Sequence, residues 1–448
     1  MGLVASAQVS RQQQESVVGD IESFLRDAIA DLQPDLEERR RLGRGRPRIL
    51  PSLCLWAGML VCVLRGFSNQ TVLWRLLSQT GLWFYPRFPV TDEAIYRRLA
   101  KEGTAPVERL FAHITQVLAS RLLPYAVPGL APFASSVIAL DQTTLDKVAR
   151  TLPHLRPLPD DAAALLPGKL AGLYDIRLQQ WRQVRYIENP LQNEKADARD
   201  MLQSLDPGAL ILCDLGYFGF AWFDYLTEAG HYYVSRLRAK TSYHCLHTFY
   251  QEGDCFDGLV FLGAYRADRA QHAVRLVRFR VGTATFSYIT NVTDPSRLPI
   301  LDIARLYTYR WDIELAFKLI KRELGLHLLW SAKPVVVQQQ LWAVLIISQV
   351  LQALRLEIAG RAAVDVYDVS LPLLVQWVPQ LAYSGVDPVA FFVERGRAAG
   401  FIRPSRRTRA QAPIVPPSLI APIPDGLVLA RSPRYANRKC GPRAFKGI

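Results

Sequence analysis

The chain has 448 residues, of which 50% are hydrophobic and 21% are charged. This composition excludes an intrinsically disordered chain, and a length well above ~200 residues allows several domains around large buried cores. Lysine and arginine number 54 and aspartate and glutamate 40, which gives a formal net charge of +14 at pH 7. A positive charge of this size favours nucleic acid or another polyanion as the partner.

Cysteine usage indicates a reducing compartment, and the lengths of the apolar runs argue against a membrane span. The six cysteines include no C-x-x-C pair, so the sequence indicates neither a zinc ribbon nor a disulfide framework. The longest apolar stretches, residues 53–64 and 341–351, are shorter than the ~18 residues of a membrane span and predict buried helices. We therefore expect a cytoplasmic protein with no secretory signal and no membrane partner. Because P-loop and dinucleotide-binding motifs are missing, we also expect no nucleotide cofactor.

Residues 1–125 are expected to form an N-terminal helical, DNA-binding region. Within a short basic run, Arg44 and Arg46 belong to an R-G-R-P sequence that is typical of an AT-hook. Such a segment places its arginines in the narrow minor groove of A·T-rich DNA, where the negative potential is strongest. The alternative is a basic linker that touches phosphates or nothing.

The same region contains three expected helices. They cover residues 56–64, residues 68–77, and a segment that begins at Thr91, a favourable N-cap. Arg97 and Arg98 are expected to face outward from the third helix. A helix, a turn and a basic helix are typical of a helix-turn-helix DNA reader, and the alternative is an ordinary bundle with a solvated basic face.

After the proline-rich residues 123–136, where we expect a domain boundary, the pattern changes to buried strands alternating with helices. Strands are expected at residues 137–140, 209–213 and 232–236, a hairpin within 169–188, and helices at 194–205 and 218–229. This order is that of a ribonuclease H-like sheet, so the expected fold class is α/β.

Further strands are expected between residues 240 and 292, followed by a long helix over 301–324 and an apolar helix over 335–359. We therefore expect a catalytic domain at 133–355 with a β-rich insertion at about 240–292. Residues 356–448 are expected to form C-terminal helices and a proline-rich basic tail.

Three carboxylates stand in positions that suit metal binding. Asp141 and Asp214 each directly follow an expected strand, and Glu314 lies midway along the expected helix 301–324. Carboxylates at adjacent strand ends, closed by one from a packed helix, can hold two Mg²⁺ ions about 3.5–4 Å apart. Oxygen ligands suit Mg²⁺ or Mn²⁺ better than Zn²⁺. The alternative for each aspartate is a turn or a helix cap.

The helix around Glu314 adds Tyr307, Arg310 and Lys321 at helical spacing. At about 100° per residue these four side chains share one face. A face of this composition suits a metal-binding carboxylate beside cations that hold DNA phosphates. The alternative is an Arg310–Glu314 ion pair, which is common on helices and contributes little.

The spacing Y-(2)-R-(3)-E-(6)-K resembles the signature of bacterial DDE transposases of the insertion-sequence-four family. The sequences A-L-D-Q-T at Asp141, D-L-G-Y-F at Asp214 and Y-I-T-N at residues 288–291 resemble the same family. One departure is Leu215, where many relatives have arginine.

The resemblance implies a ribonuclease H-like core in which Asp141, Asp214 and Glu314 are the catalytic metal ligands. It associates Tyr307 and Arg310 with the phosphates of the transposon ends and Lys321 with the DNA backbone. Further site candidates are Arg236 for DNA, and Tyr243, Phe249 and Tyr288 for stacking on a flipped base, although core packing is the alternative for these aromatics.

We expect a DNA transposase that binds the inverted-repeat ends of an insertion sequence and catalyses metal-dependent cleavage and strand transfer. Its expected partners are double-stranded DNA, as transposon ends and as target, and a second copy in a synaptic homodimer. Its expected location is the nucleoid of the bacterial cytoplasm. The alternatives are a ribonuclease H-like nuclease that does not join DNA, and a repurposed DNA-binding protein without transposition activity.

Overall fold

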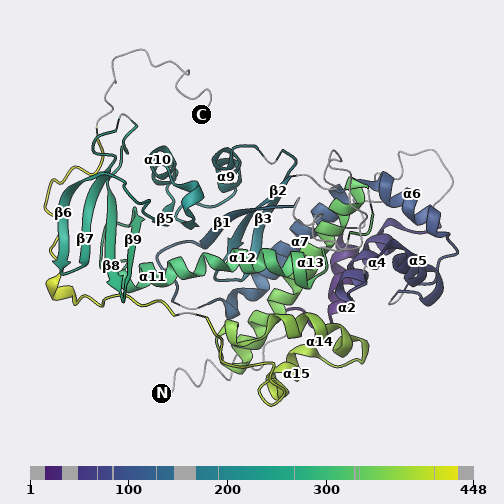
Figure 1. Ribbon diagram of the computed structural model, residues 1–448. Helices are drawn as coiled ribbons and strands as arrows, with labels where there is room; N and C mark the ends of the chain where they lie inside the picture. The colour runs from purple at the N-terminus through teal and green to yellow at the C-terminus, as the bar shows by residue number, and fades with distance from the viewer. Residues whose placement is uncertain are drawn as a thin grey trace, which may run out of the picture. The chain divides into compact units, whose positions relative to one another are not determined.

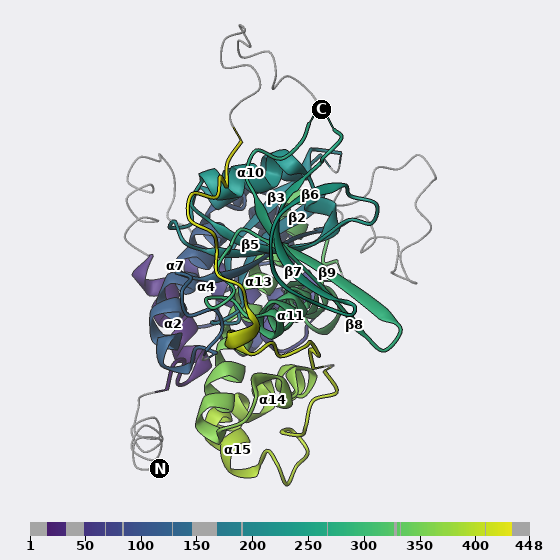
Figure 2. The same cartoon turned by 90° about the vertical axis from the view of Figure 1, so that its left-hand side faces the viewer.

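The structure is a computed structural model of the chain (Figures 1 and 2). It describes residues 16–32, 49–67, 69–82, 85–127, 129–145, 168–189, 191–266, 268–326, 329–331, 333–407 and 409–431. The chain forms two compact units. Unit 1 contains Met1–Pro128, Asp141–Gln192 and Asp312–Arg407, and unit 2 contains Gly129–Leu140, Asn193–Trp311 and Thr408–Ile448. The proposed AT-hook residues, Arg44 and Arg46, lie outside the described residues.

Unit 1 begins with a set of helices. These are α2 (Ile21–Asp31), α4 (Ser52–Leu64), α5 (Gln70–Arg75) with a π-helical turn at Leu76–Thr80, α6 (Asp92–Glu102), α7 (Ala105–Leu122) and a short 3₁₀ turn at Leu123–Tyr125. The expected start of the third helix is confirmed, because the side chain of Thr91 accepts a hydrogen bond from the backbone N–H of Ala94 at 3.2 Å. All residues of α4 are buried, which confirms the buried helix expected from its apolar run.

Helix α13 (Pro334–Ala362) is the central helix of unit 1 and packs against α4, α7 and α15 (Pro388–Arg395). By length and composition it could cross a membrane, but its most apolar 18-residue window is fully buried in the protein. That burial is typical of the core helix of a soluble protein. Helix α14 (Leu371–Tyr383) follows it, and both α14 and α15 lie beside α13.

The sheet strands of unit 1 follow the order β3-β2-β1. The expected hairpin is present as β2 (Lys169–Asp175) and antiparallel β3 (Gln180–Ile187), and β1 (Val137–Thr144) runs from unit 2 into unit 1. The carboxamide of Gln349 on α13 bonds both backbone groups of Trp181 on β3, accepting from its N–H at 2.9 Å and donating to its carbonyl at 3.0 Å. This side chain fastens the outer strand to the central helix.

In unit 2 the strand order is β1-β4-β5-β9-β8-β7-β6. The strands are β4 (Leu210–Cys213), β5 (Tyr232–Arg236), β6 (Tyr243–Glu252), β7 (Cys255–Leu262), β8 (Val274–Val281) and β9 (Ala284–Thr290). The first half of β1 pairs in parallel with β4, so that Leu140 is the partner of Cys213. Strand β4 pairs in parallel with β5, and β9 joins β5 antiparallel. The expected α/β class, with a large sheet, is thereby confirmed.

Helices cover the parallel part of this sheet. They are α9 (Glu194–Leu202), α10 (Phe220–Glu228) and α11 (Ile300–Tyr309). Both α10 and α11 pack against β5, and Figure 1 shows them on opposite sides of the strands. Strands β7, β8 and β9 lie side by side in Figure 2 and form the β-rich part expected between residues 240 and 292.

Residues 409–431 run along unit 2 (yellow in Figure 1) and are tied to its strands through backbone hydrogen bonds. The N–H of Ala421 donates to the carbonyl of Phe249 at 2.8 Å, and the N–H of Ala273 donates to the carbonyl of Leu429 at 2.7 Å. The described part of the expected basic tail is therefore a strap that is packed on the sheet.

Candidate functional site

A cavity of about 490 Å³ in unit 1 brings two of the three predicted acids together. It is lined by Asp141, Gln142 and Thr143 from β1 and by Glu314, Phe317, Lys318, Lys321 and Arg322 from α12 (Trp311–Lys318) and the π-helical turn Leu319–Glu323 that follows it. We call it the acid cavity. The predicted lysine of the signature lies in the same cavity as Asp141 and Glu314.

Strand β1 positions Asp141. The first four residues of the strand are buried and the last four are partly exposed, so Asp141 is the first residue past the buried core. Its Oδ1 accepts a hydrogen bond from the backbone N–H of Gln142 at 2.8 Å. A carboxylate at this point keeps access to solvent while its backbone is held by the sheet.

Lys321 is anchored to the same strand. Its Nζ donates to the hydroxyl of Thr143 at 2.6 Å and to the carbonyl of Thr144 at 2.7 Å. An ammonium group has three donors, and two of them are directed at β1 in this way. The lysine therefore joins the π-helical turn to the strand that carries Asp141.

The chemistry of the acid cavity suits a divalent metal and a phosphate. Asp141 and Glu314 offer the carboxylate oxygens that Mg²⁺ and Mn²⁺ prefer, and three cations from one helix and its turn surround them. Over the described ranges, no group of three or more His, Cys, Asp or Glu side chains is close enough to hold a metal ion. The structure therefore shows a two-carboxylate site in unit 1 and does not complete the predicted three-acid set.

The third acid, Asp214, lies in unit 2 with a different set of predicted residues. It follows β4 and begins the 3₁₀ turn Leu215–Tyr217, where its carboxylate accepts from the N–H of Gly216. Burial raises the pKa of Tyr307 to about 12, with opposing contributions from Arg310 and Arg236 and a smaller raising contribution from Asp214. These four residues therefore form a second cluster, in unit 2.

The two arginines of this cluster lie over the ring of Tyr307. Arg236 is 5.6 Å and Arg310 is 5.8 Å from the ring centroid. Arg236 is exposed, whereas Arg310 is only 5% exposed. Tyr288 packs on Tyr307 with 5.1 Å between ring centroids and is itself buried. Tyr288 is thus part of the packing around Tyr307, as the core alternative expected, and Phe249 is buried as well.

The expected single helix over residues 301–324 is interrupted. Helix α11 ends at Tyr309, α12 begins at Trp311, and the π-helical turn follows from Leu319. A π turn adds a residue to the helical repeat, so a constant ~100° step does not carry through it. The argument that Tyr307 and Lys321 share one face of a regular helix is therefore wrong, although both lie in candidate sites.

Of the two arginines expected to face outward from α6, only Arg97 does so. Its side chain is 72% exposed and pairs with Glu93. The side chain of Arg98 is 12% exposed, pairs with Glu102 at 2.9 Å and donates to the hydroxyl of Ser52 at 2.7 Å. Through its bond to Ser52, Arg98 fastens α6 to the start of α4.

Sequence reasoning missed two cations of the acid cavity, Lys318 and Arg322. Lys318 follows Glu314 by four residues, which places the two side chains on neighbouring turns of one helix face. This spacing could have identified Lys318 from the sequence. No sequence pattern could have identified Arg322, because the direction of its side chain depends on the π-helical turn.

Residues 187–350 match the family described as a transposase DDE domain. The match contains Asp214 and Glu314, and Asp141 precedes it. This part of the chain is therefore similar to the DDE domain of transposases, which supports the resemblance.

The chain is related to insertion-sequence transposases of Bacillus thuringiensis. It is 24% identical over 323 residues to the transposase for insertion sequence element IS231F from subspecies israelensis, which covers 60% of this chain and 65% of that protein. It is 23% identical over 244 residues to the transposase for IS231C from subspecies berliner, which covers 52% of this chain and 48% of that protein. The chain thus spans between about half and two thirds of the length of these relatives.

Among solved structures, the chain matches a piggyBac transposase synaptic complex with hairpin DNA. The TM-score is 0.40 and the sequence identity 11%, and the comparison covers 83% of this chain and 77% of that chain.

Proposed function

We propose that this protein is a transposase that binds the inverted-repeat ends of an insertion sequence, cuts the DNA there and joins the freed 3′-hydroxyl to target DNA. The observation that carries this proposal is the acid cavity, in which Asp141 and Glu314 lie beside Lys321 in a DDE transposase chain. Carboxylates and cations in one cavity suit phosphoryl transfer, which needs positioning and charge stabilisation and no protein nucleophile.

Asp141, Asp214 and Glu314 would hold the divalent metal, Mg²⁺ or alternatively Mn²⁺. The acid cavity fits such an ion, because Asp141 and Glu314 offer oxygen ligands and the lining contains neither histidine nor cysteine. When bound, the metal would make an attacking oxygen more acidic and stabilise the leaving oxygen of the phosphate.

The chain's own residues would position the DNA. Lys321, held on β1 by two hydrogen bonds, has a fixed place from which to meet a backbone phosphate. In the second cluster, Arg236 and Arg310 flank Tyr307 and would contact the phosphates of the transposon end. Since burial raises the pKa of Tyr307 to about 12, its hydroxyl is protonated at neutral pH and can donate.

We also propose a ribonuclease H-like core for residues 133–355. The support is the strand order, β3-β2-β1 in unit 1 and β1-β4-β5 in unit 2, with an antiparallel hairpin and parallel neighbours. Residues 1–125, including Arg44, Arg46 and Arg97, would bind DNA, and residues 356–448 would add helices and a basic tail. A homodimer on the paired ends, and a place in the nucleoid of the bacterial cytoplasm, complete the proposal.

The test is cleavage and strand transfer on a labelled duplex that carries the terminal repeats of the element. The reactions contain Mg²⁺, Mg²⁺ with excess EDTA, or Mg²⁺ with the Asp141→Asn variant. Nicking at the repeat boundary and a joined product, both lost with EDTA and in the variant, are the expected results. Cleavage without joining would favour a nuclease, and specific binding without cleavage would favour a repurposed DNA-binding protein.

A further inference from the structure

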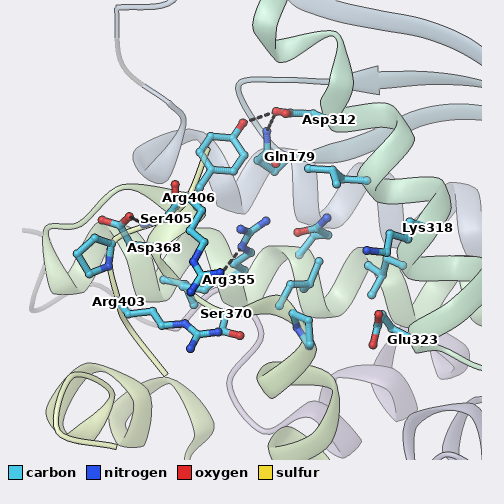
Figure 3. A pocket seen from close by; sticks show the side chains of 18 residues that line it. Gln179, Asp312, Lys318, Glu323, Arg355, Asp368, Ser370, Arg403, Ser405 and Arg406 are labelled. Atoms are coloured by element: carbon cyan, nitrogen blue, oxygen red, sulfur yellow. Dashed lines mark hydrogen bonds between the residues drawn. The ribbon is translucent and has the colours of Figure 1, made fainter. Parts of the chain in front are cut away.

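A second cavity of unit 1, of about 620 Å³, is lined by charged side chains of both signs. Four of its lining residues are cations: Lys318, Arg355, Arg403 and Arg406. Figure 3 shows the three arginines on one side of this cavity and Lys318 with Glu323 on the other. We call it the arginine cavity.

Arg355 is the buried member of the set. It projects from α13, is 8% exposed, and its Nε donates to the carbonyl of Val369 at 3.0 Å. Within the part of the chain that the structure describes, its two Nη groups donate no hydrogen bond. Burial lowers the pKa of Arg355. The Nη groups are not among the buried atoms that lack a hydrogen-bond partner, so they face the cavity and can donate to an anion that enters it.

Three carboxylates line the cavity; two of them are engaged by other groups, and the third, Glu323, lies near Lys318, away from the arginines (Figure 3). Asp312 is 3% exposed and is already engaged by three other side chains: its oxygens accept from Arg407 at 2.7 Å, from Gln179 at 3.0 Å and from the hydroxyl of Tyr367. Oδ1 of Asp368 accepts from the backbone N–H of Ser405 at 2.8 Å. Asp312 and Asp365 act on Arg355 only through their charge, and no carboxylate accepts a hydrogen bond from its Nη groups in the described residues.

The three other cations are also available. Among the described residues, Lys318, Arg403 and Arg406 form no ion pair with a carboxylate, and Arg403 and Arg406 are exposed. Arginine offers a planar fork of donors that matches phosphate oxygens. The chemistry of the cavity therefore fits a phosphate group.

The position of Lys318 shows which phosphate this would be. This lysine lines both the acid cavity and the arginine cavity, so the two adjoin within unit 1. A DNA strand whose reacting phosphate lies beside Glu314 would place a neighbouring phosphate next to Arg355.

We propose that the arginine cavity binds a backbone phosphate of the DNA strand that occupies the acid cavity. The inference rests on the proposed transposase function and adds to it a phosphate site made of Lys318, Arg355, Arg403 and Arg406. None of the four has a counterpart in the signature. Arg403 and Arg406 belong to the basic tail that was expected from the sequence to contact DNA, whereas Lys318 and Arg355 were not expected.

The test measures how the affinity for DNA depends on salt. Fluorescence anisotropy follows a fluorescein-labelled duplex of arbitrary sequence, in EDTA so that no DNA is cut, since phosphate contacts are independent of sequence. Each lost phosphate contact lowers the slope of log affinity against log salt by about 0.9. The double variant Arg403→Gln/Arg406→Gln is expected to lower the slope by the amount that corresponds to one to two phosphate contacts. Arg355→Gln is expected to lower it by the amount for about one contact.

The control is Arg395→Gln. It removes the same charge from an exposed arginine of α15 that does not line the cavity, so the slope is expected to stay at the wild-type value. Far-UV circular dichroism establishes that each variant is folded. Arg403 and Arg406 are exposed, so the double variant keeps the test valid if Arg355→Gln does not fold.

Equal slopes for the wild type, the control and the folded double variant would overturn the proposal while leaving the transposase function intact. A wild type that binds no duplex at all would remove the proposed function as well. Isothermal titration calorimetry with inorganic pyrophosphate tests the alternative that the cavity binds a free phosphate compound instead of a DNA phosphate. Tight pyrophosphate binding that depends on Arg355 and does not compete with the duplex would also overturn the proposal.

Discussion

Lys321 and Thr143 are 178 positions apart in the chain, and a hydrogen bond of 2.6 Å joins their side chains. The bond links the π-helical turn after α12 to the end of β1, the strand of Asp141. Two roles for the lysine follow from this geometry: it can hold the cavity in shape, and it can meet a DNA phosphate.

A pair of variants separates the two roles. Lys321→Ala removes both the charge and the two bonds to β1, and we expect cleavage to fall at least ~100-fold, as for the loss of a transition-state donor. Thr143→Val removes only one acceptor and should lower the rate by less than about tenfold. The measurement is single-turnover cleavage of end DNA. Equal losses in the two variants would show that the lysine acts by positioning alone.

Glu314→Gln should abolish cleavage and leave binding of end DNA nearly intact. The amide keeps the shape of the side chain but loses the charge that a divalent ion requires, so a loss of at least ~100-fold is expected. Asp302→Asn, at an exposed position of α11, is the matched control and should cut normally. If the Glu314 variant loses binding together with cleavage, the residue has a structural role.

Arg97 and Arg98 are neighbours on α6, and we expect Arg98 to act on stability and Arg97 on DNA binding. Arg98→Gln breaks its contacts with Glu102 and Ser52 and should lower the free energy of unfolding by roughly 1–3 kcal/mol without changing the salt slope of DNA binding. Arg97→Gln should leave stability unchanged and reduce the slope by about one contact, if α6 reads DNA. Urea denaturation and anisotropy provide the two measurements. A reduced slope in the Arg98 variant alone would contradict the assignment.

Unit 2 contains a buried ion pair whose loss should be costly. Arg275 and Asp257 are 0% and 2% exposed, and two hydrogen bonds of 2.6 and 2.7 Å join them. Asp257→Asn leaves the arginine buried without its counter-charge and should cost about 3–5 kcal/mol of folding free energy. Asp254→Asn, which affects the exposed pair with Arg280, should cost less than about 1 kcal/mol. Chemical denaturation compares the two, and similar losses would refute the distinction.

Tyr307 gives a prediction about pH. Burial raises its pKa from 10.0 to about 12, so the protonated form is favoured in the folded state. Its contribution to stability is complete below pH 10 and is lost as the pH rises through about 12. Tyr307→Phe should therefore lower the cleavage rate by a similar factor at every pH from about 7 to 9. A variant whose rate differs from the wild type only at the alkaline end would show that the hydroxyl ionises within this range.

Local signals predicted much of the fold. The start of α6 at Thr91, the β2–β3 hairpin and the acid at the end of β1 follow from neighbouring residues, through N-capping and hydrophobic periodicity. The acid cavity could be predicted in part, because a strand end and a helix supply Asp141 and Glu314.

Features set by long-range contacts could not be predicted. The inward position of Arg98 depends on Ser52 of α4, and the π-helical turn interrupts a helix whose spacing is regular in sequence. The arginine cavity combines α12, α13 and residues 403–406, and no periodic pattern relates such distant segments. Strand β6 has no alternating pattern of buried side chains, because Phe249 is its only fully buried residue.

The outermost strands of each unit also bear on how a second copy could associate. An open strand edge ordinarily offers its peptide groups to another chain, which leads to strand addition or aggregation. At Trp181 on β3 the carboxamide of Gln349 takes the place of such a neighbour, and at Phe249 on β6 the N–H of Ala421 does the same. At both positions the template for edge-to-edge pairing is already used within the chain. A second copy that approached at these two positions would find the strand backbone already hydrogen-bonded, which disfavours extension of the sheet there.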